Sequence, residues 1–143
     1  MHIIIAVGSS PTEEGLANRN RIRETWKSSL ENNNMGYVGR TIFFLAASDD
    51  SEVKRTIKKE AVQNQDMVIE LARKSGVETE YFFNNTALIE IKWINKFCPN
   101  AKLIFHTYDR WNADVPGILA LYKAKFDRRR PELDIVACDR NAR

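Results

Sequence analysis

The sequence predicts an α/β protein whose mostly parallel sheet carries helices on both faces. Short apolar runs, rich in β-branched residues, alternate with longer segments whose apolar residues recur at helical spacing. The first run, His2 to Val7, is continuously apolar after His2, as expected for a strand that is buried on both faces. Strands that alternate with amphipathic helices are typical of a doubly wound sheet.

The first two elements follow from this pattern. The strand at His2–Val7 ends in a loop of glycine, serine and proline. Leu16–Leu30 then reads as a helix, because Ile22, Trp26 and Leu30 are spaced four residues apart and share one face. A polar connection rich in asparagine follows this helix.

The middle of the chain predicts a second buried strand at Arg40–Ala47. Asp49, with Glu52 three residues later, is a helix start signal. We therefore expect a helix that begins at Asp49 and ends near Gln65. A short strand at Asp66–Ile69 comes next.

The last part predicts a helix at Tyr81–Phe97, a strand at Lys102–Thr107 and a short helix that starts at Asp114 with Pro116 in its first turn. A final strand is expected at Leu133–Cys138. The first of these helices has a wide apolar face, which predicts burial against the sheet. That face comprises Phe83, Ala87, Ile89, Ile91, Trp93, Ile94 and Phe97.

Composition indicates a single domain over residues 1–143, with 43% hydrophobic and 29% charged residues. No apolar run is long enough to span a membrane. The net charge is +3, and a basic run near the end is either a solvated surface or a patch for phosphate or acidic glycan. The run lacks interleaved aromatic residues, so no nucleic-acid partner is expected. It comprises Lys123, Lys125, Arg128, Arg129 and Arg130.

Cys98 and Cys138 form no disulfide framework and lack the spacing of zinc ligands. They could form one bridge or remain two thiols.

Two other features are candidates for binding. The strand at Lys102–Thr107 runs into a polar, acid-containing loop, and open α/β sheets bind ligands outside the carboxyl ends of their strands. Arg19 and Arg23 share one helix face, where they could clamp a diphosphate or form local salt bridges.

Several motifs together resemble the β-1,3-galactosyltransferase-like glycosyltransferases of glycosyltransferase family 31. Their order and spacing agree across nearly the whole chain, apart from inserted residues near Leu71–Glu78 and a short deletion before Trp93. The matching stretches are Arg19–Trp26 (R-x-x-I-R-x-T-W), Thr41–Leu45, Glu60-Ala61 with Gln65-Asp66, Asn84–Thr86, and Trp93 through Cys98–Lys102 (W…C-P-N-A-K).

The resemblance implies a GT-A type, Rossmann-like fold, of which this chain supplies only the N-terminal, nucleotide-sugar-binding half. The family moves galactose or N-acetylglucosamine from a UDP-sugar donor to a glycan hydroxyl acceptor, with inversion. Its enzymes lie in the Golgi lumen on an N-terminal membrane anchor, and we expect no anchor segment within residues 1–143. In this picture Ser9, Arg19 and Arg23 lie beside the nucleotide, and the loop after the fourth strand supplies an acidic triplet that holds Mn²⁺.

That triplet reads Tyr108-Asp109-Arg110 here, so the motif is degenerate and Asp109 is a remnant metal ligand. A hard cation needs carboxylate oxygens to offset the loss of its water. A unit charge at ~4 Å contributes about 4 kcal/mol at an effective dielectric near 20, so an arginine reverses a favourable term. We expect Mn²⁺ not to bind in the usual way. Arg110 could itself neutralise the diphosphate.

The family's acceptor-binding segment and its E-D-V acid, the presumed general base, lie downstream of the matched region. Without a base the transfer loses a step worth about 10² to 10⁴ in rate. The resemblance therefore implies a divergent, C-terminally truncated hexosyltransferase that is inactive or a fragment of an enzyme. The alternative is a non-catalytic module that binds a nucleotide or a partner.

Overall fold

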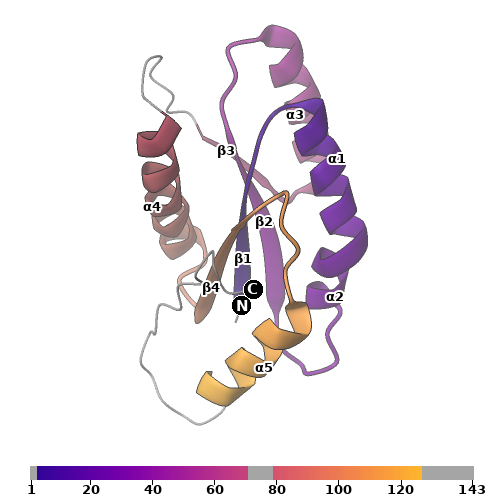
Figure 1. The fold of residues 1–143 in the computed structure, drawn as a ribbon, viewed down its shortest axis with the longest axis vertical. Helices are drawn as coiled ribbons and strands as arrows, with labels where there is room; N and C mark the ends of the chain where they lie inside the picture. Colours follow the sequence, from indigo (N-terminus) through magenta and orange to yellow (C-terminus); the bar gives the residue numbers. More distant parts are fainter. Residues whose placement is uncertain (1–2, 71–78, 127–143) are drawn as a thin grey trace.

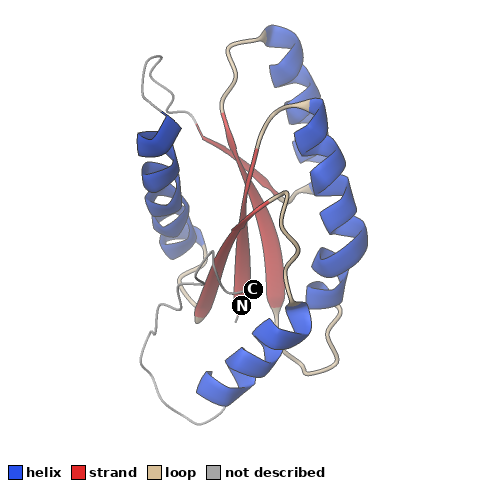
Figure 2. Cartoon of the chain, viewed as in Figure 1, coloured by secondary structure: helices blue, strands red, loops and turns tan. Residues whose placement is uncertain are grey.

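The computed structural model describes residues 3–70 and 79–126, and its centre is a parallel sheet with the strand order β3-β2-β1-β4. Figure 1 shows the sheet between two layers of helices, and Figure 2 shows helices on either side of the strands. This confirms the predicted α/β class. The strands are β1 (Ile3–Ser9), β2 (Gly39–Ala46), β3 (Met67–Glu70) and β4 (Leu103–Tyr108).

The register brings the carboxyl ends of β1 and β4 together, although these strands are far apart in the sequence. Ile3 lies opposite both Gly39 and Leu103, and Gly8 lies opposite Tyr108. β1 is therefore paired on both sides along its length, which explains why its residues are continuously apolar. The loop that follows β4 begins directly beside the loop that follows β1.

The first predicted helix is interrupted by a π-helical turn. It consists of α1 (Glu13–Ile22), the π-helix η1 (Arg23–Lys27) and α2 (Ser28–Glu31). Thr25 departs from helical geometry, with φ −111° and ψ −107°, and its hydroxyl donates to the Arg21 carbonyl at 2.7 Å. One extra residue in a turn of this kind shifts the helix face that follows it. The helix also starts earlier than predicted, with Thr12 as its cap.

The second helix, α3 (Ser51–Asn64), begins two residues later than predicted. Its cap is Asp50 rather than Asp49, because the Asp50 carboxylate accepts the backbone N–H groups of Glu52 and Val53 at 2.8 and 3.1 Å. The cap of α5 (Val115–Phe126) is confirmed, since Asp114 accepts the Gly117 N–H at 3.1 Å.

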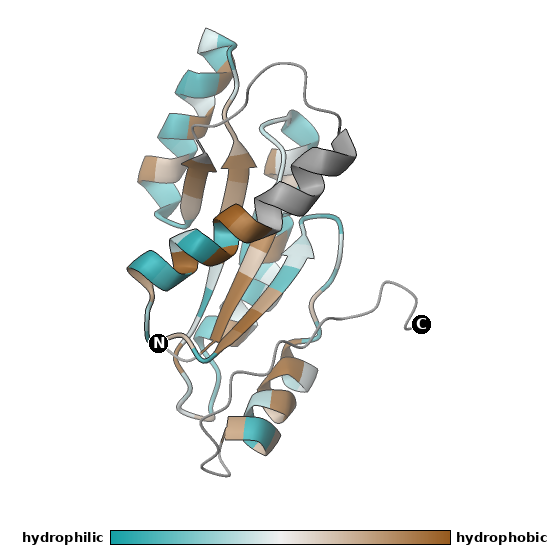
Figure 3. Ribbon diagram, turned by 90° about the vertical axis from the view of Figure 1, so that its left-hand side faces the viewer, coloured by the Kyte–Doolittle hydropathy of each residue, from teal (hydrophilic) through white to brown (hydrophobic). Residues whose placement is uncertain are grey.

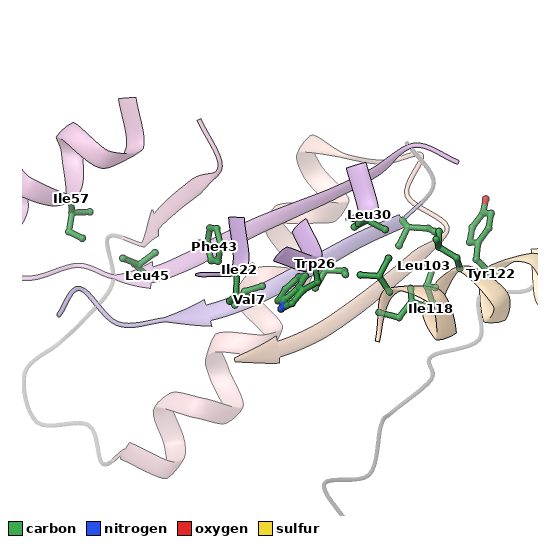
Figure 4. Packing of buried hydrophobic residues seen from close by; sticks show 14 residues of the cluster. Val7, Ile22, Trp26, Leu30, Phe43, Leu45, Ile57, Leu103, Ile118 and Tyr122 are labelled. Atoms are coloured by element: carbon green, nitrogen blue, oxygen red, sulfur yellow. The ribbon is translucent and has the colours of Figure 1, made fainter. Parts of the chain in front are cut away.

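The main core lies on the sheet face that α1, η1, α2, α3 and α5 cover. Figure 4 shows its side chains in a continuous row from Ile57 at one end to Tyr122 at the other. α5 contributes four buried residues to this core: Val115, Ile118, Leu119 and Tyr122.

The opposite sheet face is covered by α4 (Thr79–Phe97), which lies across the strands in Figure 3. Ile94 is fully buried there, but the wide apolar face predicted for this helix is wrong in part. Ile91 is 40% exposed, Phe97 is 58% exposed, and Ile89 is exposed as well. The reason is geometric: the helix packs on the sheet along one narrow stripe, and Glu90 shares that stripe with Ile94.

Some predictions concern parts that the structure leaves undescribed. The strand at Leu133–Cys138 and the arginines of the basic run lie outside the described residues, as do the side chains of Phe83 and Ala87. Within the described parts, no helix is both long enough and apolar enough to cross a membrane.

Candidate functional site

The carboxyl ends of β1 and β4 meet at Ser9 and Asp109. The Ser9 hydroxyl donates to Oδ2 of Asp109 at 2.6 Å, and the Asp109 N–H donates to the Gly8 carbonyl at 3.0 Å. The Asn18 amide, on α1, reaches Oδ1 of Asp109 at 3.4 Å. Asp109 is only 9% exposed. Both oxygens of its carboxylate therefore accept hydrogen bonds from within the protein.

Arg19 extends this arrangement into the interior and is fully buried, at 0% exposed. Its Nη1 donates to the Ser9 hydroxyl at 2.8 Å and to the Ser10 carbonyl at 2.7 Å. Its Nε and Nη2 donate to the two carboxylate oxygens of Glu60, on α3, each at 2.7 Å. This bidentate geometry is the strongest that a guanidinium makes with a carboxylate.

Arg23 continues the same chain of contacts, one turn further along. It donates to Glu60 at 2.8 Å and to both oxygens of Asp66 at 2.8 and 2.9 Å. Its guanidinium also lies 5.0 Å from the centre of the Phe43 ring. Ser9, Arg19, Glu60, Arg23 and Asp66 therefore form one connected network, called here the buried ion-pair network.

The network shifts the pKa values of its members. Burial alone would raise the pKa of Glu60, but hydrogen bonds from Arg19 and Arg23 outweigh it and hold that pKa below its usual value. Burial alone would lower the pKa of Arg23, but its bonds to Asp66 and Glu60 raise it instead. Glu60 therefore stays ionised between its two guanidiniums.

The sequence left two roles open for Arg19 and Arg23: binding a diphosphate or forming local salt bridges. In the structure both form local salt bridges. Their guanidiniums are directed at Glu60 and Asp66, and the ion pairs are 2.7 to 2.8 Å long. Contact of either arginine with a nucleotide stays a prediction. The sequence did not identify Glu60 as their partner, although its position in a motif was the signal that could have.

Tyr108 and Arg110, on either side of Asp109, lie differently. The Tyr108 ring packs against the backbone of β1 so closely that a Cβ on Gly8 would lie 2.9 Å from it. Arg110 is exposed. Arg21 fixes the loop that carries Asp109 and Arg110, because it donates to the Asp109 carbonyl at 2.8 Å and to the Asn112 side chain at 2.5 Å. Sequence reasoning missed this role of Arg21.

This donor set does not fit a divalent metal ion. Asp109 is the remaining carboxylate of the triplet, and its oxygens already accept hydrogen bonds from Ser9 and Asn18. Across residues 3–70 and 79–126, no three His, Cys, Asp or Glu side chains are close enough to hold an ion together. Mn²⁺ prefers several oxygen ligands, so we derive no chemical step through a metal.

A second titratable pair, Glu90 and His106, lies beneath α4. Glu90 is 1% exposed, and its Oε2 is 2.6 Å from Nδ1 of His106. The contact is a salt bridge when the His106 imidazole is protonated. One signal for this pair is visible in the amino-acid sequence, because Glu90 interrupts an otherwise apolar helix face.

The fold and the site define a class: a parallel α/β domain with a cluster of polar residues at the carboxyl ends of β1 and β4, where such sheets bind ligands. The family model described as Galactosyltransferase matches residues 17–140. The chain belongs to this galactosyltransferase family, which confirms the resemblance read from its motifs.

Three curated proteins are similar to the chain. A lactosylceramide 1,3-N-acetyl-beta-D-glucosaminyltransferase A from Xenopus laevis is 24% identical over 123 residues, which cover 85% of this chain and 32% of the relative. Beta-1,3-galactosyltransferase 5 from Pan troglodytes and from Gorilla gorilla gorilla are each 25% identical over 105 residues, or 73% of this chain and 33% of the relative. The chain thus spans about a third of the length of these relatives.

Proposed function

We propose that the chain is the nucleotide-sugar-binding part of a hexosyltransferase domain, and that by itself it does not transfer a sugar. Family membership supports a reaction in which galactose or N-acetylglucosamine passes from a UDP-sugar to a glycan hydroxyl. The matched region is about a third of each relative. This supports assigning the acceptor site and the general base to the rest of such a domain. The family also supports a Golgi lumenal location.

The observation that carries the proposal is the environment of Asp109. Its two carboxylate oxygens accept hydrogen bonds from Ser9 and Asn18, and the exposed Arg110 follows it directly. A divalent ion would have to displace these bonds beside a guanidinium. We therefore propose that Arg110, rather than Mn²⁺, offsets the charge of the diphosphate, since its planar donors suit phosphate oxygens.

Thermal unfolding of the full chain tests this. We expect UDP, UDP-galactose and UDP-N-acetylglucosamine to raise Tm by a small amount, because a ligand that binds the folded state stabilises it by RT ln(1 + [L]/Kd). The rise should be the same in Mn²⁺ and in EDTA, and Arg110→Ala should remove it. A rise that appears only with Mn²⁺ would contradict the proposal.

Restoring the acidic triplet is the sharper experiment. Tyr108→Asp with Arg110→Asp should make UDP stabilisation depend on Mn²⁺. The control is Lys58→Asp with Val62→Asp, which removes the same amount of charge at two exposed positions of α3. Because the Tyr108 ring packs on Gly8, the single variant Arg110→Asp is measured as well. Each variant is compared with its own Tm without ligand.

The alternative function is a non-catalytic module that binds a nucleotide or a partner. The pairing of Arg19 and Arg23 with Glu60 and Asp66 favours it, because neither guanidinium is left for a diphosphate. The restored variant separates the two readings. If neither it nor the parent chain responds to UDP, partner binding is the better account. Release of UDP from UDP-galactose by the unaltered chain would contradict both.

A further inference from the structure

The edge of β2 that faces away from β1 is only half covered by β3. The Ile3 N–H donates to the Val38 carbonyl at 3.1 Å, so the backbone groups of Val38 and Arg40 are directed toward β1. By alternation, those of Gly39 and Thr41 are directed toward the opposite edge. β3 pairs with β2 only from Phe43 onward. Within the described residues, no strand pairs with Gly39 or Thr41 on that edge.

A groove of about 700 Å³ lies along this open edge. Lys27 and Glu31 line it from the α2 side of the sheet, and Trp93 and Cys98 line it from the α4 side. Its floor is the start of β2, and residues 64–68 close it where β3 begins. The groove therefore reaches around the strand edge onto both faces of the sheet. A ligand here meets backbone donors and acceptors in the middle and side chains on either side.

The groove also contains a buried polar group without a partner. Thr41 lines it and is 1% exposed, and its Oγ1 makes no hydrogen bond in the described structure. A buried hydroxyl without a partner destabilises the folded chain, because it has lost its hydrogen bonds to water. A bound group that supplies a donor or acceptor at this point would recover part of that energy.

We propose that this groove binds an extended peptide of a partner protein, which adds to β2 as a strand in front of β3. Strand addition draws its affinity from backbone hydrogen bonds to an open edge, and its specificity from pockets for alternate side chains. Here one set of peptide side chains would face Lys27 and Glu31, and the alternate set would face Trp93 and Cys98. Gly39 to Ile42 provide an edge of about 13 Å at ~3.3 Å per residue.

The charges of the groove specify the peptide further. Lys27 pairs with Glu31 at 2.8 Å, and Asp66 pairs with Arg23 at 2.8 Å. Arg40 is exposed, and no ion pair involves it among the described residues. It lies on the same face of β2 as Ile42, the face that α4 covers. The fitting peptide is therefore extended, with an acidic and apolar face toward α4 and a hydroxyl-bearing face toward Thr41.

The probe is a fluorescein-labelled peptide, Thr-Val-Thr-Glu-Thr-Val-Thr, which reads the same in both directions and so fits either strand orientation. Its binding to the full chain is measured by fluorescence anisotropy. We expect it to bind about fivefold more tightly than the same peptide with lysine in place of glutamate, the ratio that ~1 kcal/mol of surface charge interaction gives. Arg40→Glu should reverse the preference. The matched control Arg55→Glu, on the exposed face of α3, should leave it unchanged.

The reactivity of Cys98 provides a second measurement of peptide binding, because its thiol is free and lines the groove. In a Cys138→Ser background, bound peptide should slow the alkylation of Cys98, and a peptide with proline at its centre should not. Equal binding of the glutamate, lysine and proline peptides would overturn the proposal. So would protection of Cys98 without peptide that grows with protein concentration, because the groove would then be occupied by a second copy of the chain.

Discussion

Glu60 is the carboxylate that Arg19 and Arg23 share, so it balances the charge of both guanidiniums. It is 7% exposed and accepts hydrogen bonds from Arg19 and Arg23, of which Arg19 has no contact with solvent. A buried ion pair adds little net stability when it is complete, because desolvation offsets the attraction. Removal of one partner is costly, since the other charge is left buried without compensation.

Glu60→Gln should therefore lower the free energy of unfolding by about 3–5 kcal/mol, measured by urea denaturation. The neutral amide keeps the shape of the side chain but leaves Arg19 buried without an anion. The control is Glu52→Gln at an exposed position of the same helix, whose contact with Arg55 is 3.6 Å long. That change should stay within about 0.5 kcal/mol. Equal effects of the two substitutions would show that the network carries no special energy.

At the scale of elements, α1 shows how one helix performs two tasks. Its second half carries Asn18, Arg19 and Arg21, which hold the loops after β1 and β4. Ile22 at the end of α1, Trp26 within the π-helical turn and Leu30 in α2 all enter the core. The polar residues and these apolar residues therefore occupy different faces of the same continuous helix.

The start of α3 provides a test at this scale. Asp50 caps the helix, whereas the neighbouring Asp49 does not, although both are exposed acids. Asp50→Ala should lower the free energy of unfolding by about 1 kcal/mol, because two backbone N–H groups lose their acceptor. Asp49→Ala is the matched control and should have almost no effect in the same denaturation experiment. A larger loss of stability in Asp49→Ala than in Asp50→Ala would show that Asp49 is the cap, as predicted from the sequence.

At the scale of the whole molecule, the buried ion-pair network joins parts that are distant in the chain. It connects the end of β1, the middle of α1, the last turns of α3 and the entry to β3 through Ser9, Arg19, Glu60 and Asp66. A change in the protonation of this network therefore affects the contacts between all of these elements.

This makes the stability of the chain depend on pH. The pKa of Glu60 is lower in the folded chain than its usual value of 4.5, so the folded state binds fewer protons than the unfolded state in that range. The stabilisation is complete above about pH 4.5 and is lost as the pH falls through the lower, folded pKa. Unfolding free energies between pH 7 and pH 3 should show this decline. In Glu60→Gln part of the slope should be absent; an unchanged slope would contradict the assignment.

Some of the fold and of the site could be predicted from particular residues. The apolar runs in the sequence predict β1 and β2, and Asp114 with Pro116 predicts the start of α5. Burial by α4 was predicted too broadly, because periodicity shows which residues share a face but not how wide the contact is. The positions of Ser9 and Asp109 at strand ends were evident, but their hydrogen bond spans 100 residues of sequence.

The sequence by itself determined the α/β class, the family and the degenerate triplet Tyr108-Asp109-Arg110, because these depend on local pattern and on residue identity. Only the tertiary structure decided that Arg19 and Arg23 share Glu60, that Asp109 is held by Ser9, and that half of the β2 edge is open. The physical reason is that hydrogen bonds and ion pairs depend on distances of about 3 Å, which strand order and helix packing set.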